Sequence, residues 1–125
     1  MRGYKIRKKD DKWIFEFYPG KSDYEKPKGK SAEYATRNAC IEAMFDFERF
    51  IQKNEIIDEK SDFVTIVVGK GIYGVEYSFE YHNESGKLLF YRDPPYRNNR
   101  ANCQNAVKEI YRDIHEYVSH EIEDI

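Results

Sequence analysis

The chain has 125 residues, 35% of them charged and 16% aromatic, and a formal net charge of −2. This length predicts one compact unit, and no apolar run approaches the ~18 residues that a membrane span requires. The basic N-terminal segment lacks the apolar stretch of a signal peptide. Two cysteines are too few for a disulfide framework, and no Cys/His cluster has zinc spacing, so we expect a reducing, cytoplasmic setting without membrane association.

Positive charge is concentrated at the start of the chain. Residues 1–30 carry ten Lys or Arg against five Asp or Glu, whereas the remaining 95 carry eleven against eighteen. This asymmetry favours steering of an anionic ligand or head-to-tail association, although two solvated surfaces would show the same pattern. A net negative chain with one modest basic segment argues against nucleic acid as a partner.

The first predicted element is a β-hairpin. Residues 4–9 (YKIRKK) and 12–18 (KWIFEFY) flank a turn at Asp10 and Asp11, and large apolar side chains alternate along the second run. A period of two is typical of a strand with one buried face. The side chains expected on that face are Trp13, Phe15 and Phe17. Residues 19–31 are predicted to form a loop because of their Pro and Gly content.

A helix is predicted next, from Thr36 as the N-cap to about Lys53, because apolar residues recur at spacings of three and four. Its expected buried residues are Cys40, Ala43, Met44, Phe47, Phe50 and Ile51. Residues 54–62 (NEIIDEKSD) are charged and are predicted to form a linker.

The second half follows the same order. Its predicted strands are residues 63–69, 73–82 and 87–92. A tight turn (NESG) joins the last two, and Pro94 and Pro95 end the third because proline cannot donate to the ladder. The final helix has Asn98 or Asn99 as its cap. Its expected buried residues are Cys103, Val107, Ile110, Ile114 and Val118.

Two motifs recur at an offset of about half the chain. Arg-x-x-Cys-x-x-Ala begins at Arg37 and again at Arg100, and Phe-Glu occurs at Phe15 and again at Phe79. We therefore predict a tandem repeat in one compact unit, an α+β fold in which two hairpin-plus-helix copies form a pseudo-symmetric antiparallel sheet with two helices. A copy of ~50 residues cannot bury enough apolar surface alone, so each depends on the other. The predicted boundaries are 1–53, linker 54–62 and 63–125.

Residues 77–110, YSFEYHNESGKLLFYRDPPYRNNRANCQNAVKEI, combine an aromatic strand, an Asn-x-x-Gly turn, an apolar strand and an Ala-containing helix. In this order the chain resembles the YegP-like family of small bacterial proteins, which are built from tandem strand-strand-strand-helix repeats. The first half departs from the pattern, because residues 23–31 lack the turn and the apolar third strand. The resemblance implies the fold and an assembly as dimers or pseudo-dimers, and it carries no catalytic residues. We expect a homodimer or higher oligomer.

No catalytic motif has the required spacing. His115 and His120 are five residues apart, whereas two zinc ligands on one helix face are about four apart. Residues 69–74 (GKGIYG) lack the spacing and the terminal Lys-Ser or Lys-Thr of a phosphate loop. Both cysteines lie on apolar helix faces, where burial lowers thiol reactivity. We therefore expect neither an enzyme nor a cofactor.

Helix starts expose unpaired N–H groups and a partial positive charge, which attract anions. Each predicted helix start has a tyrosine and an arginine beside it, so we expect a small phosphorylated or nucleotide-type ligand to bind there. The candidate residues are Lys28, Lys30, Tyr34, Thr36, Arg37, Tyr96, Arg97, Asn98, Asn99 and Arg100. The structural alternative is that Thr36 and Asn98 or Asn99 only cap the helices.

A protein-interaction module or inhibitor, of bacterial or phage origin, is the alternative function. It would act through charged surfaces and exposed aromatic residues such as Tyr24, Tyr91 and Tyr111. Both hypotheses describe binding rather than chemistry.

Overall fold

A computed structural model describes residues 2–19, 26–116 and 122–124. The first half contains β1 (Arg2–Lys9), β2 (Lys12–Pro19), β3 (Gly29–Ser31) and α1 (Arg37–Lys53). The second half contains β4 (Val64–Gly71), β5 (Gly74–His82), β6 (Leu88–Tyr91), β7 (Tyr96–Arg97), α2 (Arg100–Glu116) and β8 (Ile122–Asp124). The predicted α+β class is confirmed.

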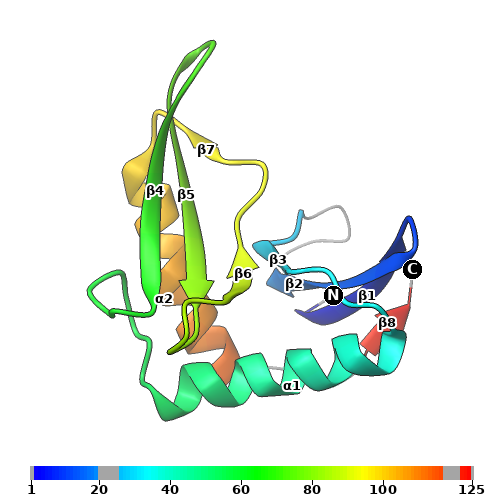
Figure 1. Cartoon of the computed structure of the whole chain (residues 1–125). Coiled ribbons are helices and arrows are strands. Elements are labelled where there is room, and N and C mark those ends of the chain that lie inside the picture. The colour runs from blue at the N-terminus through cyan, green and yellow to red at the C-terminus, as the bar shows by residue number, and fades with distance from the viewer. Residues whose placement is uncertain (1, 20–25, 117–121, 125) are drawn as a thin grey trace.

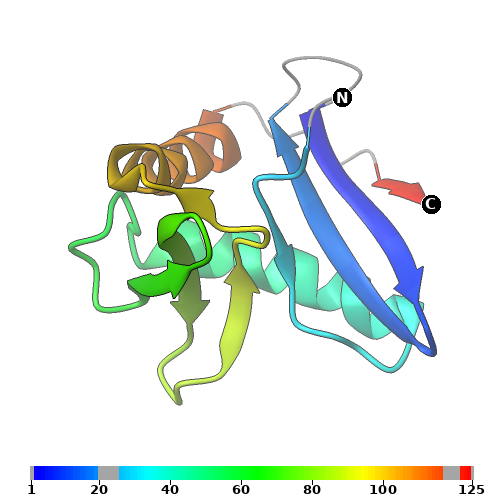
Figure 2. The ribbon, with the colours of Figure 1, turned by 90° about the horizontal axis from the view of Figure 1, so that it is seen from above.

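The described strands form one eight-stranded sheet with the order β4-β5-β6-β3-β2-β1-β8, and β7 pairs with β5 beside β6. Neighbours are antiparallel except for β8, which runs parallel to β1. Figure 1 shows the sheet as two arms, with β4 and β5 on the left and β1 and β2 on the right. Helix α1 passes beneath both arms, and α2 lies against the β4–β5 arm (Figure 2). In the described residues, no helix is both long and apolar enough to cross a bilayer.

Strand β3 joins the two arms, because it pairs with β2 on one side and with β6 on the other. The sequence predicted a loop here, and this prediction was wrong. A Cβ atom on Gly29 would lie 2.5 Å from the Phe90 ring, so the small residue leaves room for that ring. The Ser31 hydroxyl accepts a hydrogen bond from the Phe15 amide at 2.9 Å and donates to the Ala32 carbonyl at 2.8 Å. Because β3 consists of a glycine, a lysine and a serine, it has no apolar pattern in the sequence.

One backbone pairing recurs at corresponding positions of the two halves. Trp13 forms an antiparallel bridge with Tyr34, and Tyr77 pairs in the same way with Tyr96. A duplicated unit would have these matched pairings, and the duplication itself stays a prediction.

The core lies between the sheet and the two helices, and most of the predicted buried positions are confirmed. Fully or almost fully buried are Phe15, Phe17, Cys40, Met44, Phe47, Ile51, Phe79, Cys103, Val107, Ile110 and Ile114. Ala43 and Phe50 are half-buried at the edge of the core, and Val118 lies outside the described residues. The Phe47 and Phe90 rings stack with centroids 4.8 Å apart, which places an aromatic cluster under the β3–β6 junction.

Two features outside the predicted elements also add to the packing. Ile56, in the middle of the predicted linker, is fully buried, and its amide donates to the Ile51 carbonyl at 3.2 Å. Strand β8, which the sequence did not predict, brings Ile122 opposite Tyr4. The end of the chain thus lies beside its first strand (Figure 1).

Candidate functional site

The predicted ligand residues fall into separate groups. Helix α1 begins beneath the right arm of the sheet, whereas α2 begins near the upper end of the left arm (Figure 1). The structure therefore does not bring the two helix starts into one pocket.

Side chains cap both helices at corresponding positions. The Thr36 hydroxyl accepts a hydrogen bond from the Ala39 amide at 3.1 Å, and the Asn99 side-chain oxygen accepts one from the Asn102 amide at 3.0 Å. Each bond satisfies a backbone N–H that the helix leaves unpaired. Of the two asparagines that the sequence offered as caps, Asn99 is the one that caps α2.

Asn98 instead holds the β4–β5 hairpin. Its φ of 52° lies in the left-handed region, which asparagine tolerates better than most residues. Its side-chain oxygen accepts from the Val75 amide at 3.0 Å, and its side-chain amide donates to the Tyr73 carbonyl at 3.3 Å. Gly74 has a φ of 129°, and a Cβ there would lie 2.3 Å from the Asn98 oxygen. Only glycine therefore allows this approach.

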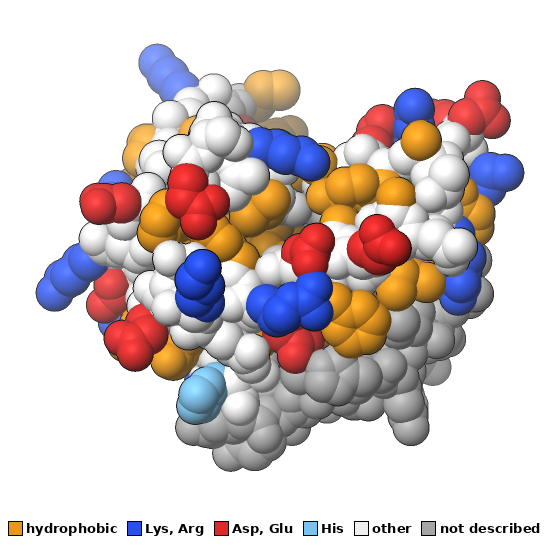
Figure 3. Space-filling model, turned by 60° about the horizontal axis from the view of Figure 1, so that its bottom comes forward, with side chains coloured by type: hydrophobic (Ala, Val, Ile, Leu, Met, Phe, Trp, Pro, Cys, Tyr) orange, Lys and Arg blue, Asp and Glu red, His pale blue; other side chains and the backbone are white. Residues whose placement is uncertain are grey.

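Tyr34 lines a cleft of about 370 Å³ between α1 and the β5–β6 turn. The other lining residues are Ala39, Glu42, Ala43, Asp46, Phe47, Phe50, Asn83, Glu84, Lys87 and Leu89. Three carboxylates lie here against one ammonium group, and that group, on Lys87, lies 5.5 Å from the Tyr34 ring centroid. This charge balance disfavours an anionic ligand. On the face that Figure 3 shows, acidic, basic and hydrophobic side chains are interspersed.

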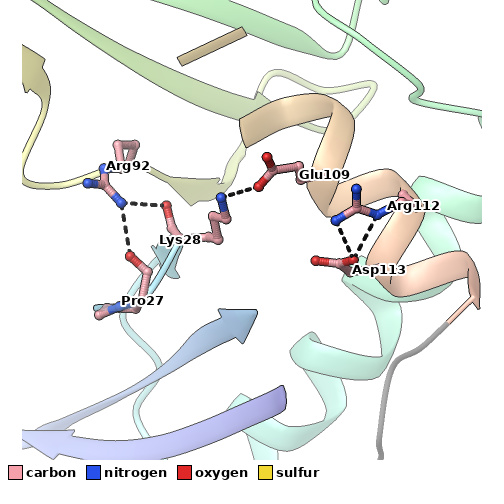
Figure 4. A network of polar contacts seen from close by, with 6 residues as sticks. All are labelled: Pro27, Lys28, Arg92, Glu109, Arg112 and Asp113. Carbon is pink, nitrogen blue, oxygen red and sulfur yellow. Dashed lines mark hydrogen bonds and ion pairs between the residues drawn. The ribbon is translucent and has the colours of Figure 1, made fainter. Parts of the chain in front are cut away.

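Lys28 and Lys30 form ion pairs at the middle of the molecule. Lys28 pairs with Glu109 of α2, and Arg92 donates to the carbonyls of Pro27 and Lys28 at 3.0 and 3.4 Å (Figure 4). Lys30 pairs with Asp93 at 3.0 Å. These contacts link the β3 region to the second half, so both lysines join the two halves.

The residues around the start of α2 form pairs of cations and aromatic rings. The Arg92 guanidinium lies 4.1 Å from the Tyr96 ring centroid, and that of Arg97 lies 5.3 Å from the Tyr73 ring. Arg100 lies 5.9 Å from the Tyr77 ring. It also forms an ion pair with Glu59 at 3.8 Å. The corresponding residue in the first half, Arg37, is half-buried at the start of α1.

The two cysteines are buried and free. Burial raises the pKa of each thiol to about 11, although Arg37 acts in the opposite direction on Cys40. A thiol with such a pKa carries little thiolate near neutral pH, and the thiolate is the nucleophile. Within the described ranges, no group of three or more His, Cys, Asp or Glu could hold a metal ion.

The β4–β5 hairpin carries the most exposed large hydrophobic residues among those described. Ile72 is 94% exposed, Tyr73 is 74% exposed and Val68 is 54% exposed. The hairpin projects beyond the start of α2, as Figure 1 shows, so its core-facing stripe continues past the helix that covers it. The β1–β2 hairpin ends at the pair Lys9–Lys12 and has a charged turn of two aspartates.

A hollow of about 350 Å³ adjoins this hairpin tip. Its lining residues are Ile72, Tyr73, Gly74, Glu76, Pro94, Pro95 and Arg97. Beside one glutamate, the walls carry Tyr73 and Arg97, and tyrosine and arginine are among the residues that dominate binding energy at protein interfaces. The hairpin tip and this hollow form one continuous surface, here called the tip surface.

The tip surface was not among the predicted sites. As a candidate site, residues 69–74 were compared only with a phosphate loop, although Ile72 and Tyr73 lie between two glycines where turns favour polar residues. Two large apolar residues in a tight turn were the sequence feature that could have indicated this surface. Of the aromatic residues proposed for interaction, Tyr91 and Tyr111 are half-buried, and Tyr24 lies outside the described residues.

Two solved structures share this fold. The solution NMR structure of the yegP protein of unknown function from E. coli has a TM-score of 0.64 and 10% identity, covering 98% of this chain and 90% of that chain. A UPF0339 protein from Shewanella oneidensis has a TM-score of 0.65 and 14% identity, with 98% and 89% covered. No protein-family model and no curated protein matches the sequence. The chain therefore has the YegP-like fold, and at these identities the likeness shows the fold alone.

Proposed function

We propose that this YegP-like fold serves as a non-enzymatic protein-interaction module that binds its partner through the tip surface. The observation that carries the proposal is the exposure of Ile72 and Tyr73, at 94% and 74%, at the end of a rigid hairpin. Neither residue contributes to the core or suits the turn chemistry, so burial against another protein is the role that their apolar surface supports.

Rigidity strengthens this proposal. The Asn98 side chain bonds the backbone on both sides of Gly74, and the Asn98 backbone amide donates to the Val75 carbonyl at 2.7 Å. A hairpin held in this way loses little conformational entropy when it binds. Full burial of a side chain such as that of Ile72 contributes roughly 1.5–3 kcal/mol.

Affinity capture from a lysate of the source cell tests the proposal. The bait is the whole chain, compared with a tip variant carrying Ile72→Ser and Tyr73→Ser. The matched control is Asp11→Ser, an exposed position in the turn of the opposite hairpin. We expect at least one protein whose recovery falls about tenfold or more with the tip variant, equivalent to ~1.4 kcal/mol, and is unchanged with the control. Equal recovery of every protein by all three baits would contradict the proposal.

A small anionic ligand at the start of α2 is the second candidate. Arg97, Asn99 and Arg100 gather there, although Asn99 already caps the helix and Arg100 already has Glu59 as a partner. Calorimetry with a nucleotide separates the two functions. An affinity that Arg100→Ala abolishes would favour the ligand, and the absence of heat with the unmodified chain would eliminate it. The cytoplasmic setting stays a prediction.

A further inference from the structure

Strand β4 ends the sheet, and no described strand pairs with its outer edge. The His82 amide donates to the Phe63 carbonyl at 2.9 Å, so odd-numbered residues of this strand direct their backbone groups toward β5. In an antiparallel ladder the alternate residues point the other way. Ile66, Val68 and Lys70 therefore present their N–H and C=O groups along the open edge, and Val64 presents its carbonyl, whereas the Val64 amide already donates to the Ser61 carbonyl at 3.4 Å. Such an edge is a template for another strand.

The side chains along this edge are mainly apolar. Val64, Ile66 and Val68 lie on the core face, opposite Tyr81, Phe79 and Tyr77 of β5. Val68 is 54% exposed although it lies on that face. The only charged residue within β4 is Lys70, and a charge of this kind usually protects an edge from pairing. Whether β4 accepts a second strand therefore depends on what lies opposite Lys70.

We propose that β4 pairs antiparallel with β4 of a second copy of this chain, with the twofold axis at Ile66. Continuity of the core face requires each residue to pair with one whose side chain lies on the same face. Ile66 then lies opposite Ile66 of the second copy, and Val64 lies opposite Val68. One step further out, Lys70 comes opposite the turn that precedes the strand, where Asp62 is exposed. Two Lys–Asp pairs thus flank an apolar centre.

Charge complementarity selects this register. An axis at Val67 would place Lys70 opposite Val64, and an axis at Val68 would place it opposite Ile66. Either arrangement sets an ammonium group against an aliphatic side chain, whereas opposite charges in cross-strand pairs are favourable. Twofold pairing of identical edges also closes, so it produces dimers rather than fibres. The inference goes beyond the proposed function and does not rest on it, because it concerns purified copies of the chain alone.

Sedimentation of the purified whole chain over a concentration series tests the proposal. We expect a dimer, and we expect Asp62→Lys and Lys70→Asp each to raise its dissociation constant about tenfold or more, because each places like charges opposite one another twice. The double variant restores both pairs with exchanged signs, so its dissociation constant should return to near that of the unmodified chain. Thermal unfolding of every variant shows whether the monomer remains folded.

The charge exchange keeps the test specific. A chain that sediments as a monomer at every concentration would overturn the proposal. So would a dimer that both single substitutions leave unchanged. A dimer that they weaken but the double variant fails to restore would also overturn it, because the pairing of residue 62 with residue 70 would then be wrong.

Discussion

Replacing Tyr81 with phenylalanine should stabilise the protein. The Tyr81 side chain is fully buried in the core, and its hydroxyl group has no hydrogen-bond partner among the residues that the structure describes. Burying a hydroxyl without a partner costs roughly 1–3 kcal/mol, because the group loses its bonds to water. Removing the oxygen removes that cost and leaves the ring contacts with Phe79 and Phe90 unchanged. We expect the free energy of unfolding to rise by about 1 kcal/mol.

Replacing Tyr4 with phenylalanine is a matched substitution that should lower the free energy of unfolding. It is equally buried, but its hydroxyl donates a hydrogen bond to the buried Glu48 carboxylate at 3.2 Å. Tyr4→Phe deletes the same atom and removes a donor from a charged acceptor, which costs roughly 1.5–3 kcal/mol. Burial, together with the nearby Glu48 charge, also raises the pKa of Tyr4, so the hydroxyl keeps its proton in the folded state.

Urea unfolding followed by circular dichroism measures both changes, with the midpoint compared at constant slope. We expect the two variants to differ by about 2.5–4 kcal/mol in their free energies of unfolding, with the unmodified chain between them. A Tyr81→Phe variant that is less stable than the unmodified chain, or a Tyr4→Phe variant that is equally stable, would refute this expectation.

Two further predictions concern the helices. Between pH 9 and about 11 the unfolded chain releases the protons of Cys40 and Cys103 while the folded chain retains them. Stability should therefore fall as pH rises through this interval, by up to ~1.4 kcal/mol per pH unit for each thiol, and urea unfolding should show a smaller fall when both are alanine. Thr36→Ala and Asn99→Ala should each lower the free energy of unfolding by ~1 kcal/mol, as thermal melts can show, and a neutral result for either would contradict its role as a cap.

The sequence correctly predicted the strands and helices whose residue patterns depend on close neighbours. The alternation in residues 12–18 and the helical spacing after Thr36 depend on neighbouring residues only, so both elements appear close to where they were expected. Cys40 and Cys103 were expected in the core for the same reason, and both are fully buried.

Contacts between residues far apart in the sequence determined the features that were not predicted. Gly29 and Ser31 form a strand because Phe90 and the Phe15 amide lie beside them, and neither neighbour is close in sequence. Lys28 was placed at a helix start, but Glu109, which is 81 residues away, holds it elsewhere. Side chains that bind partners far away in the sequence have no periodic pattern, so from the sequence these residues were expected to bind a ligand.

The position of β3 has a consequence for the order of folding. Its pairing with β6 joins Lys30 to Tyr91, residues that are far apart along the chain. On a ribosome, β3 is synthesised well before β6, so the Gly29–Ser31 edge waits for its neighbour. Closing so long a loop is slow, and the middle of the sheet should therefore be the last part to become protected from hydrogen exchange during refolding.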